Sequence, residues 1–205
     1  MKFFRRAVLA AVALLSPALA DETKSYALQE GDIVFTSSAR GQGRAIIDAT
    51  GSCYTHCGII IIQNGKRMVL EAIEPVSITP LERFISFSAP GTFMARRLKI
   101  QVVPAAYQAA KAWGVSMVGT KYDAQFLWDD ERMYCSELVW KIYEKAGVRL
   151  CEPNMLGDYA LDKPSVRQAI VEKYGSFENL PKNEKVVAPS DLAMSALLIE
   201  VPKIR

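Results

Sequence analysis

The chain has 205 residues, 50% of them hydrophobic, and carries 25 Lys and Arg against 22 Asp and Glu. Three of the basic residues, Lys2, Arg5 and Arg6, lie at the extreme N-terminus, and without them basic and acidic residues balance at 22 each. A balanced charge gives no support to nucleic-acid binding, so we expect no nucleic acid among the partners.

Residues 1–20 predict a secretory signal peptide. A basic start is followed by an apolar run at residues 7–15 and by the A-x-A pattern Ala18-Leu19-Ala20. The apolar run is shorter than the ~20 residues that a membrane-spanning helix needs, and no later stretch reaches that length. We therefore expect cleavage after Ala20, a periplasmic or secreted protein, and no transmembrane segment in the mature chain; a retained N-terminal anchor is the alternative.

The mature chain, residues 21–205, is long enough to bury one substantial core. We find no internal repeat, low-complexity tract or composition shift that would mark a domain boundary. One domain over residues 21–205 is therefore expected, and the sequence does not indicate its oligomeric state.

Short β-rich runs alternate with amphipathic helices along this domain. Asn64-Gly65 joins the runs 57–63 and 66–73 and is the strongest two-residue signal for a β-hairpin. Thr79-Pro80-Leu81-Glu82 has the order of an N-cap, a first-turn proline and a capping-box glutamate. Because the hairpin is antiparallel and the elements are mixed, the expected class is α+β. In chain order we expect a strand at 31–35, an ambiguous segment at 44–50, the hairpin, a helix at 79–87, a strand at 92–99, a helix at 104–118, a loop at 119–123, helices at 132–146, 162–174 and 189–195, and a strand at 197–201.

His56 is the only histidine, so it is the only imidazole available for acid–base chemistry near neutral pH. A two-residue turn places Gln63 opposite Lys66, and the antiparallel register then places Glu71 opposite Gly58. His56 and Glu71 share a sheet face as diagonal neighbours, whereas Cys57 and Glu74 lie off that face.

A carboxylate bonded to one imidazole nitrogen fixes the tautomer and leaves the other nitrogen for proton transfer. Glu71 is therefore the candidate to orient His56 as a general base. The alternative is a histidine held in a purely structural ion pair.

Cys135 is the candidate nucleophile, because it lies near the start of the expected helix 132–146. Unpaired N–H groups and the positive end of the helix dipole stabilise a thiolate there. Asp129 and Asp130 are candidate caps just upstream. The helical spacing places Cys135 on one stripe with Leu138, Val139 and Ile142, which should pack on the sheet. An inert core cysteine is the alternative for this residue alone.

The other three cysteines, Cys53, Cys57 and Cys151, are less suited to nucleophilic catalysis, since no helix N-terminus activates Cys151 and Cys57 lies off the His56 face. A Cys53–Cys57 or Cys53–Cys151 disulfide and free thiols are all compatible with the spacing. A zinc site built from Cys53, His56, Cys57 and a distant cysteine, in a zinc-stabilised periplasmic binding module, is a competing interpretation.

Together these residues resemble the YaeF/YiiX-type permuted papain-like amidases, relatives of the NlpC-type cell-wall hydrolases. In ordinary papain-like enzymes the cysteine helix precedes the histidine strand, whereas here His56 and Glu71 precede Cys135. The resemblance spans roughly residues 31–143, in the segments Gly31-Asp32-Ile33-Val34-Phe35, Tyr54-Thr55-His56-Cys57-Gly58, Leu70-Glu71-Ala72 and Lys121-Tyr122-Asp123 through Tyr134-Cys135-Ser136-Glu137.

The resemblance implies a circularly permuted papain-like fold, with a mostly antiparallel sheet packed against the cysteine helix. It implies an amide hydrolase with Cys135 as nucleophile, His56 as general base and acid, and Glu71 as orienting residue, without a metal or other cofactor. Tyr122 is expected to line the site or to donate to the oxyanion, with a packed loop tyrosine as the alternative. Substrates left open are small peptides, amino-acid amides and acyl lipids; a lipid-directed acyltransferase or esterase on the same triad is the alternative function.

Overall fold

A computed structural model describes residues 26–38 and 42–204, and the expected signal peptide lies outside these residues. Its centre is a six-stranded sheet in the order β10-β5-β1-β2-β3-β4, in which every pairing is antiparallel. The α+β class and the mostly antiparallel sheet are thus confirmed. The strands are β1 (Ile33–Thr36), β2 (His56–Gln63), β3 (Lys66–Glu71), β4 (Ser77–Pro80), β5 (Met94–Leu98) and β10 (Leu198–Glu200).

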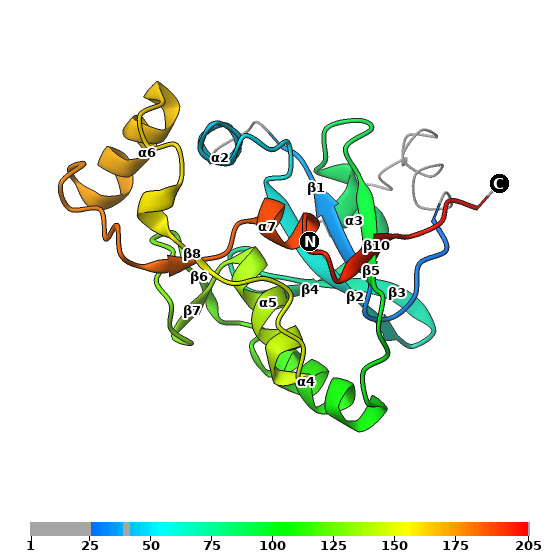
Figure 1. Cartoon of the computed structure of the whole chain (residues 1–205). Coiled ribbons are helices and arrows are strands. Elements are labelled where there is room, and N and C mark those ends of the chain that lie inside the picture. Colours follow the sequence, from blue (N-terminus) through cyan, green and yellow to red (C-terminus); the bar gives the residue numbers. More distant parts are fainter. Residues whose placement is uncertain (1–25, 39–41, 205) are drawn as a thin grey trace, which may run out of the picture.

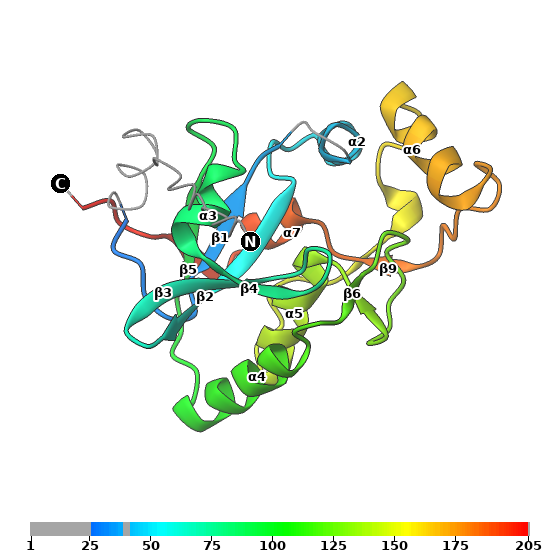
Figure 2. The ribbon, with the colours of Figure 1, turned by 180° about the vertical axis from the view of Figure 1, so that it is seen from behind.

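Helices cover both faces of this sheet (Figures 1 and 2). The helices α4 (Pro104–Ser116) and α5 (Cys135–Lys145) pack on one face, where Ile59 and Ile61 of β2 join the main core. The short helix α3 (Leu81–Ser86) packs on the other face, against Ile60. A continuous apolar run, rather than an alternating one, is what a strand buried on both faces requires.

The hairpin of β2 and β3 has the predicted register. Gln63 pairs with Lys66 and Ile59 pairs with Leu70. Asn64 and Gly65 both have positive φ, 51° and 73°, as a type I′ turn demands. Register and turn type therefore follow from two residues of local sequence.

The two ends of the described chain meet at the edge of the sheet. Tyr26 and Lys203 form an antiparallel bridge, and β10 adds to β5 as the outermost strand. Beside them the Asp32 carboxylate binds Arg97 through two bonds of 2.7 Å. The N-terminal segment is thus held both to β5 and to the C-terminal residues.

A second group of elements lies beyond the N-terminal end of α5 (Figure 1). The helices α2 (Gly43–Thr50) and α6 (Pro164–Tyr174) lie side by side there and share a small apolar cluster that includes Ala45, Val166 and Ile170. Other short elements complete the region: β6 (Lys121–Tyr122), β7 (Arg132–Met133), β8 (Asn154–Met155), the 3₁₀ helix η1 (Leu156–Asp158), β9 (Lys185–Val186) and α7 (Pro189–Ala193).

Several predicted boundaries were wrong. The helix expected from residue 132 begins at Cys135, because Arg132 and Met133 pair in parallel with Lys121 and Tyr122. The segment 119–123, expected as a loop, supplies that partner strand. Thr79 and Pro80 end β4 rather than starting a helix, and α3 begins at Leu81.

The distribution of apolar residues also bears on membrane insertion. Within the described residues, no helix combines the length and apolar character needed to cross a membrane.

Candidate active site

The first residue of β2, His56, and the last residue of β3, Glu71, are joined across the hairpin. The distance between His56 Nε2 and Glu71 Oε2 is 2.6 Å, and Glu71 is buried while the imidazole is partly exposed. Gly58 stands between them: a Cβ at this position would lie 3.2 Å from the Glu71 Cβ and 2.4 Å from a methyl group of Val69. A side chain at position 58 would therefore disturb the contact that the register creates.

The ring of His56 also packs on Phe84 of α3, with ring centroids 5.4 Å apart. Because Nε2 is bonded to Glu71, Nδ1 is the nitrogen left for a reacting group. The structure thus brings together the predicted pair and fixes the orientation of its imidazole.

Cys135 is the first residue of α5, with Tyr134 as the N-cap. The thiol is 4% exposed and shares the main core with Leu138, Val139 and Ile142, as the stripe predicted. It accepts hydrogen bonds from His56 and from both the thiol and the backbone N–H of Cys57. Residues far apart in sequence, 56 and 135, therefore meet where β2 begins and α5 begins.

These contacts favour an ion pair between a Cys135 thiolate and a His56 imidazolium. The hydrogen bond from Cys57, followed by the positive charge of His56, holds the pKa of Cys135 well below its usual range although burial opposes this. Burial lowers the pKa of His56, but the Cys135 thiolate and then Glu71 raise it to about 10. Thiolate and imidazolium are therefore the stable pair near neutral pH.

The start of α5 is fixed by Glu137 and not by the predicted caps Asp129 and Asp130. The Tyr134 N–H donates to Glu137 Oε2 at 3.3 Å, and Lys141 Nζ lies 2.7 Å from Glu137 Oε1. Burial raises the pKa of Glu137 to about 8 despite the lysine. The sequence signal was present, since a glutamate three residues after an N-cap is typical of a capping box.

Asp129 and Asp130 have other partners. Asp129 Oδ1 accepts the backbone N–H groups of Glu131 and Arg132, and Asp130 pairs with Lys141 at 2.8 Å. Both acidic residues thus shape the loop before α5 and do not cap the helix that carries Cys135.

Tyr122 lies next to the thiol. Its backbone N–H donates to Glu74 Oε2 at 3.0 Å, so the second glutamate of the hairpin region positions this tyrosine. Burial and the nearby Cys135 charge raise the pKa of the Tyr122 hydroxyl well above its usual range. The hydroxyl therefore keeps its proton and is able to donate.

The remaining cysteines are free thiols. Cys57 faces the α5 side of the sheet, away from the His56 face as predicted, but the thiol contacts Cys135 directly. This contact was not predicted, because it joins a strand to a helix far along the chain. Cys53 is exposed and Cys151 lies after α5 with its pKa raised to about 12 by burial.

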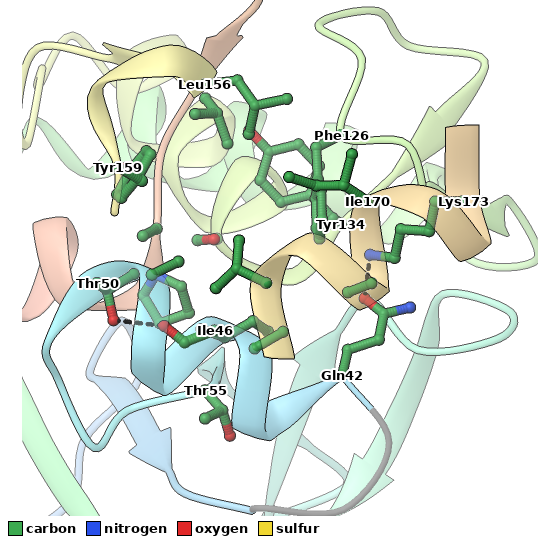
Figure 3. A pocket seen from close by; sticks show the side chains of 18 of the residues that line it. Gln42, Ile46, Thr50, Thr55, Phe126, Tyr134, Leu156, Tyr159, Ile170 and Lys173 are labelled. Atoms are coloured by element: carbon green, nitrogen blue, oxygen red, sulfur yellow. Dashed lines mark hydrogen bonds between the residues drawn. The ribbon is translucent and has the colours of Figure 1, made fainter. Parts of the chain in front are cut away.

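Two hollows open at this site. An apolar one, about 110 Å³, lies between α2 and α6 (Figure 3), and Cys135 is among the residues that line it. A second hollow, about 230 Å³, is lined by His56. Thr55 and Tyr122 line both, so the hollows meet beside the thiol and the imidazole.

Comparisons with known proteins agree with this arrangement. The family model described as permuted papain-like amidase enzyme, YaeF/YiiX, C92 family, matches residues 27–201. YiiX of Escherichia coli strain K12 is 38% identical over 180 residues, which cover 85% of this chain and 86% of YiiX. The crystal structure described as metalloprotein yiiX from Escherichia coli O157:H7 has a TM-score of 0.79 and 37% identity, covering 86% of this chain and 97% of that one. The chain therefore belongs to the YaeF/YiiX family of permuted papain-like amidases and is an enzyme of the cysteine hydrolase type.

Proposed function

We propose that the protein is an exported amidase in which Cys135 is the nucleophile, His56 the general base and acid, and Glu71 the residue that orients His56. The observation that carries this proposal is the joint contact of the three side chains: His56 bonds Glu71 at 2.6 Å and also bonds the thiol at the start of α5. This is the nucleophile–base–orienter relation of covalent acyl transfer.

In the proposed reaction the Cys135 thiolate attacks the amide carbonyl carbon and forms a C–S bond. The His56 imidazolium gives its proton to the leaving nitrogen as the C–N bond breaks, and an amine departs. Water then attacks the thioester, His56 accepts its proton, and the C–S bond breaks to release a carboxylic acid. The first step needs a protonated imidazole and the second a neutral one, and a single histidine supplies the two forms in turn.

The developing oxyanion is proposed to bind at the first turn of α5, with the Tyr122 hydroxyl as a further donor. The first N–H groups of a helix have no partner within the helix, and the dipole favours negative charge there. Loss of one oxyanion donor lowers kcat by roughly 10²–10³ in well-characterised cases. We therefore expect Tyr122→Phe to lower kcat with little change in the pH dependence of Cys135 alkylation.

A direct test uses the mature chain, residues 21–205, and a panel of amino-acid p-nitroanilides. We expect release of p-nitroaniline by the wild type and none by Cys135→Ser, with hydroxylamine trapping the acyl group as a hydroxamate. Glu71→Gln should lower kcat at least tenfold, whereas Glu82→Gln on the exposed side of α3 should not. Equal release by wild type and Cys135→Ser would overturn the proposal.

Export is a separate part of the proposal and rests on residues 1–20 alone. Expression of the full chain in a Gram-negative host should give a periplasmic protein whose N-terminal residue is Asp21. A protein that keeps Met1 and remains in the cytoplasm would contradict this part without touching the chemistry.

The description of the solved relative as a metalloprotein raises the question of a metal here. Within residues 26–38 and 42–204, no three His, Cys, Asp or Glu side chains are grouped to hold a metal ion. The full ligand set of the zinc alternative is not available either, because Cys53 is exposed and His56 Nε2 bonds Glu71. The described residues do not fit a metal site, and we assign no step to one.

Lipid-directed acyl transfer is the second candidate function. The apolar hollow beside Cys135 favours it, because an acyl-enzyme shielded by apolar side chains could be resolved by an alcohol or amine in place of water. Adding an acceptor alcohol to the assay separates the two: transfer gives an ester, whereas hydrolysis gives only the free acid.

A further inference from the structure

The apolar hollow is built mostly by the chain after Cys135, which the catalytic proposal leaves without a role. Ile46, Leu156 and Ile170 line it (Figure 3), together with Ala49 of α2, Val166 of α6 and Leu161. The surface of this hollow is almost wholly apolar. It opens on the thiol of Cys135, so whatever fills it lies next to the reacting carbonyl.

Most of the polar side chains in the lining already form a hydrogen bond within the protein. Lys173 is the ammonium in the lining, and Nζ of this residue donates to Gln42 Oε1 at 2.6 Å and lies 4.2 Å from the centre of the Phe126 ring. The same holds for the hydroxyl groups: Thr50 donates to Ile46 O, Thr55 to Ser38 O, Ser136 to Val187 O, Tyr159 to Asp191 and Tyr174 to Gln125 O, while the Tyr134 hydroxyl accepts the Val187 N–H.

This arrangement selects against a polar occupant. A hydroxyl or carboxylate of a ligand would lose its water and find very little polar surface in this hollow, which costs free energy, whereas an apolar group gains from leaving water. Near the reacting centre a polar atom meets Cys135 in the apolar hollow, His56 in the second hollow, and Tyr122, which lines both.

The two hollows also accommodate different halves of an amide substrate. The leaving nitrogen must lie within reach of His56, which lines the second hollow and is not among the residues that line the apolar one. The amine half therefore extends over the His56 side. The acyl half, which stays on Cys135 as a thioester, extends into the apolar hollow.

From this geometry we infer that the substrate is an amide whose acyl group is apolar and about six carbons in size, with the chain after Cys135 serving as its acyl-binding pocket. The size follows from the volume of about 110 Å³, since an apolar protein cavity of ~150 Å³ accommodates benzene. This inference rests on the proposed amidase function, because the acyl and amine halves are assigned from the roles of Cys135 and His56.

The test is protection of Cys135 in the mature protein from iodoacetamide by acetamide, hexanamide and the monoamide of adipic acid. Each methylene that leaves water strengthens binding about fourfold, so hexanamide should protect at a concentration at least tenfold below that of acetamide. The adipic monoamide has the same six-carbon chain but ends in a carboxylate, and it should protect no better than acetamide.

A matched pair of variants on α6 tests the location. Ala169→Phe places a ring in the hollow and should abolish the advantage of hexanamide, whereas Val171→Phe, at a position 48% exposed, should keep it. Equal protection by all three amides in the wild type would overturn the inference, as would retained hexanamide protection in a folded Ala169→Phe protein. Loss of preferential Cys135 alkylation in the wild type would instead contradict the proposed amidase function.

Discussion

The sulfur of Cys135 depends on a second cysteine as much as on the histidine. Cys57 donates to it through a thiol and a backbone N–H, and this residue follows His56 directly in β2. Neighbouring residues of a strand point to opposite faces. One residue of the pair therefore packs on Phe84, and the other reaches the α5 side and meets the thiol.

We predict that Cys57→Ala raises the pH at which Cys135 becomes half-ionised by about one unit, because a hydrogen bond to a charged group is worth roughly 1.5–3 kcal/mol. Cys57→Ser keeps a donor and should shift the midpoint less. The measurement is the pH dependence of Cys135 alkylation, with Cys53→Ala at an exposed cysteine as control. Identical midpoints for Cys57→Ala and wild type would contradict the assigned hydrogen bond.

The residues of this site could be predicted from the sequence more completely than the contacts among them. His56 was identified because it is the only histidine, and Glu71 because a two-residue turn fixes which side chains share a face. The contact of Cys57 with Cys135 joins a strand to a helix far along the chain, and no local pattern encodes such a contact.

At the scale of elements, the β2–β3 hairpin sets the distance between His56 and Glu71. A Cβ on Gly58 would meet a Val69 methyl at 2.4 Å and the Leu70 carbonyl oxygen at 3.0 Å. A backbone oxygen cannot move without displacing the strand, so the two strands must shift apart.

Gly58→Ala should therefore lower the free energy of unfolding by about 1–3 kcal/mol, the usual cost of overpacking a core. It should also slow Cys135 alkylation at pH 7, because Glu71 moves away from His56. Urea unfolding and alkylation rates check the two effects. Gly65→Asn, at the far end of the same hairpin where nothing lies within 4 Å, should leave the alkylation rate unchanged, although its φ of 73° makes the substitution cost some stability.

Element boundaries were predictable where a local signal sets them. The Asn64-Gly65 turn is such a case, and so is the end of α2 at Gly51, which has a φ of 67°. The start of α5 was misplaced by three residues because Arg132 and Met133 are drawn into a two-residue parallel pairing with Lys121 and Tyr122. That pairing depends on the tertiary fold and overrides helix propensity.

At the scale of the whole molecule, an ion pair between Asp32 and Arg97 near the chain ends holds the N-terminal segment to the sheet. The Asp32 carboxylate is 1% exposed, binds Arg97 twice at 2.7 Å, and accepts the Gln29 N–H. Arg97 Nη2 also donates to Ala27 O, so one guanidinium joins β5 to the N-terminal segment.

Asp32→Asn should lower the free energy of unfolding by about 3 kcal/mol, since it leaves the partly buried Arg97 without its charged partner. Glu144→Gln removes an exposed pair with Arg149 and should cost less than about 1 kcal/mol. Thermal or urea unfolding gives both values. A loss of stability for Asp32→Asn no larger than that for Glu144→Gln would show that the pair does not hold the sheet edge.

The overall class and the permuted order of the site residues could be predicted, because an antiparallel hairpin and the sequence order of His56, Glu71 and Cys135 are visible in the chain. The apolar hollow could not. Its walls come from α2 and α6, whose pairing brings together segments more than a hundred residues apart. Nothing in either amphipathic pattern states which helix its apolar face will meet.

The central claim is that Cys135 and His56 form a thiolate–imidazolium pair, and the rate of Cys135 alkylation as a function of pH tests it most directly. The thiolate persists above the lowered pKa of Cys135, and the imidazolium persists below the His56 pKa of about 10. We predict a rate nearly independent of pH between about 6 and 8 for the wild type, and a rate for His56→Ala that falls at least tenfold at pH 6. A wild-type rate that rises about tenfold per pH unit over this range, as for an ordinary thiol of pKa about 8.5, would contradict the account.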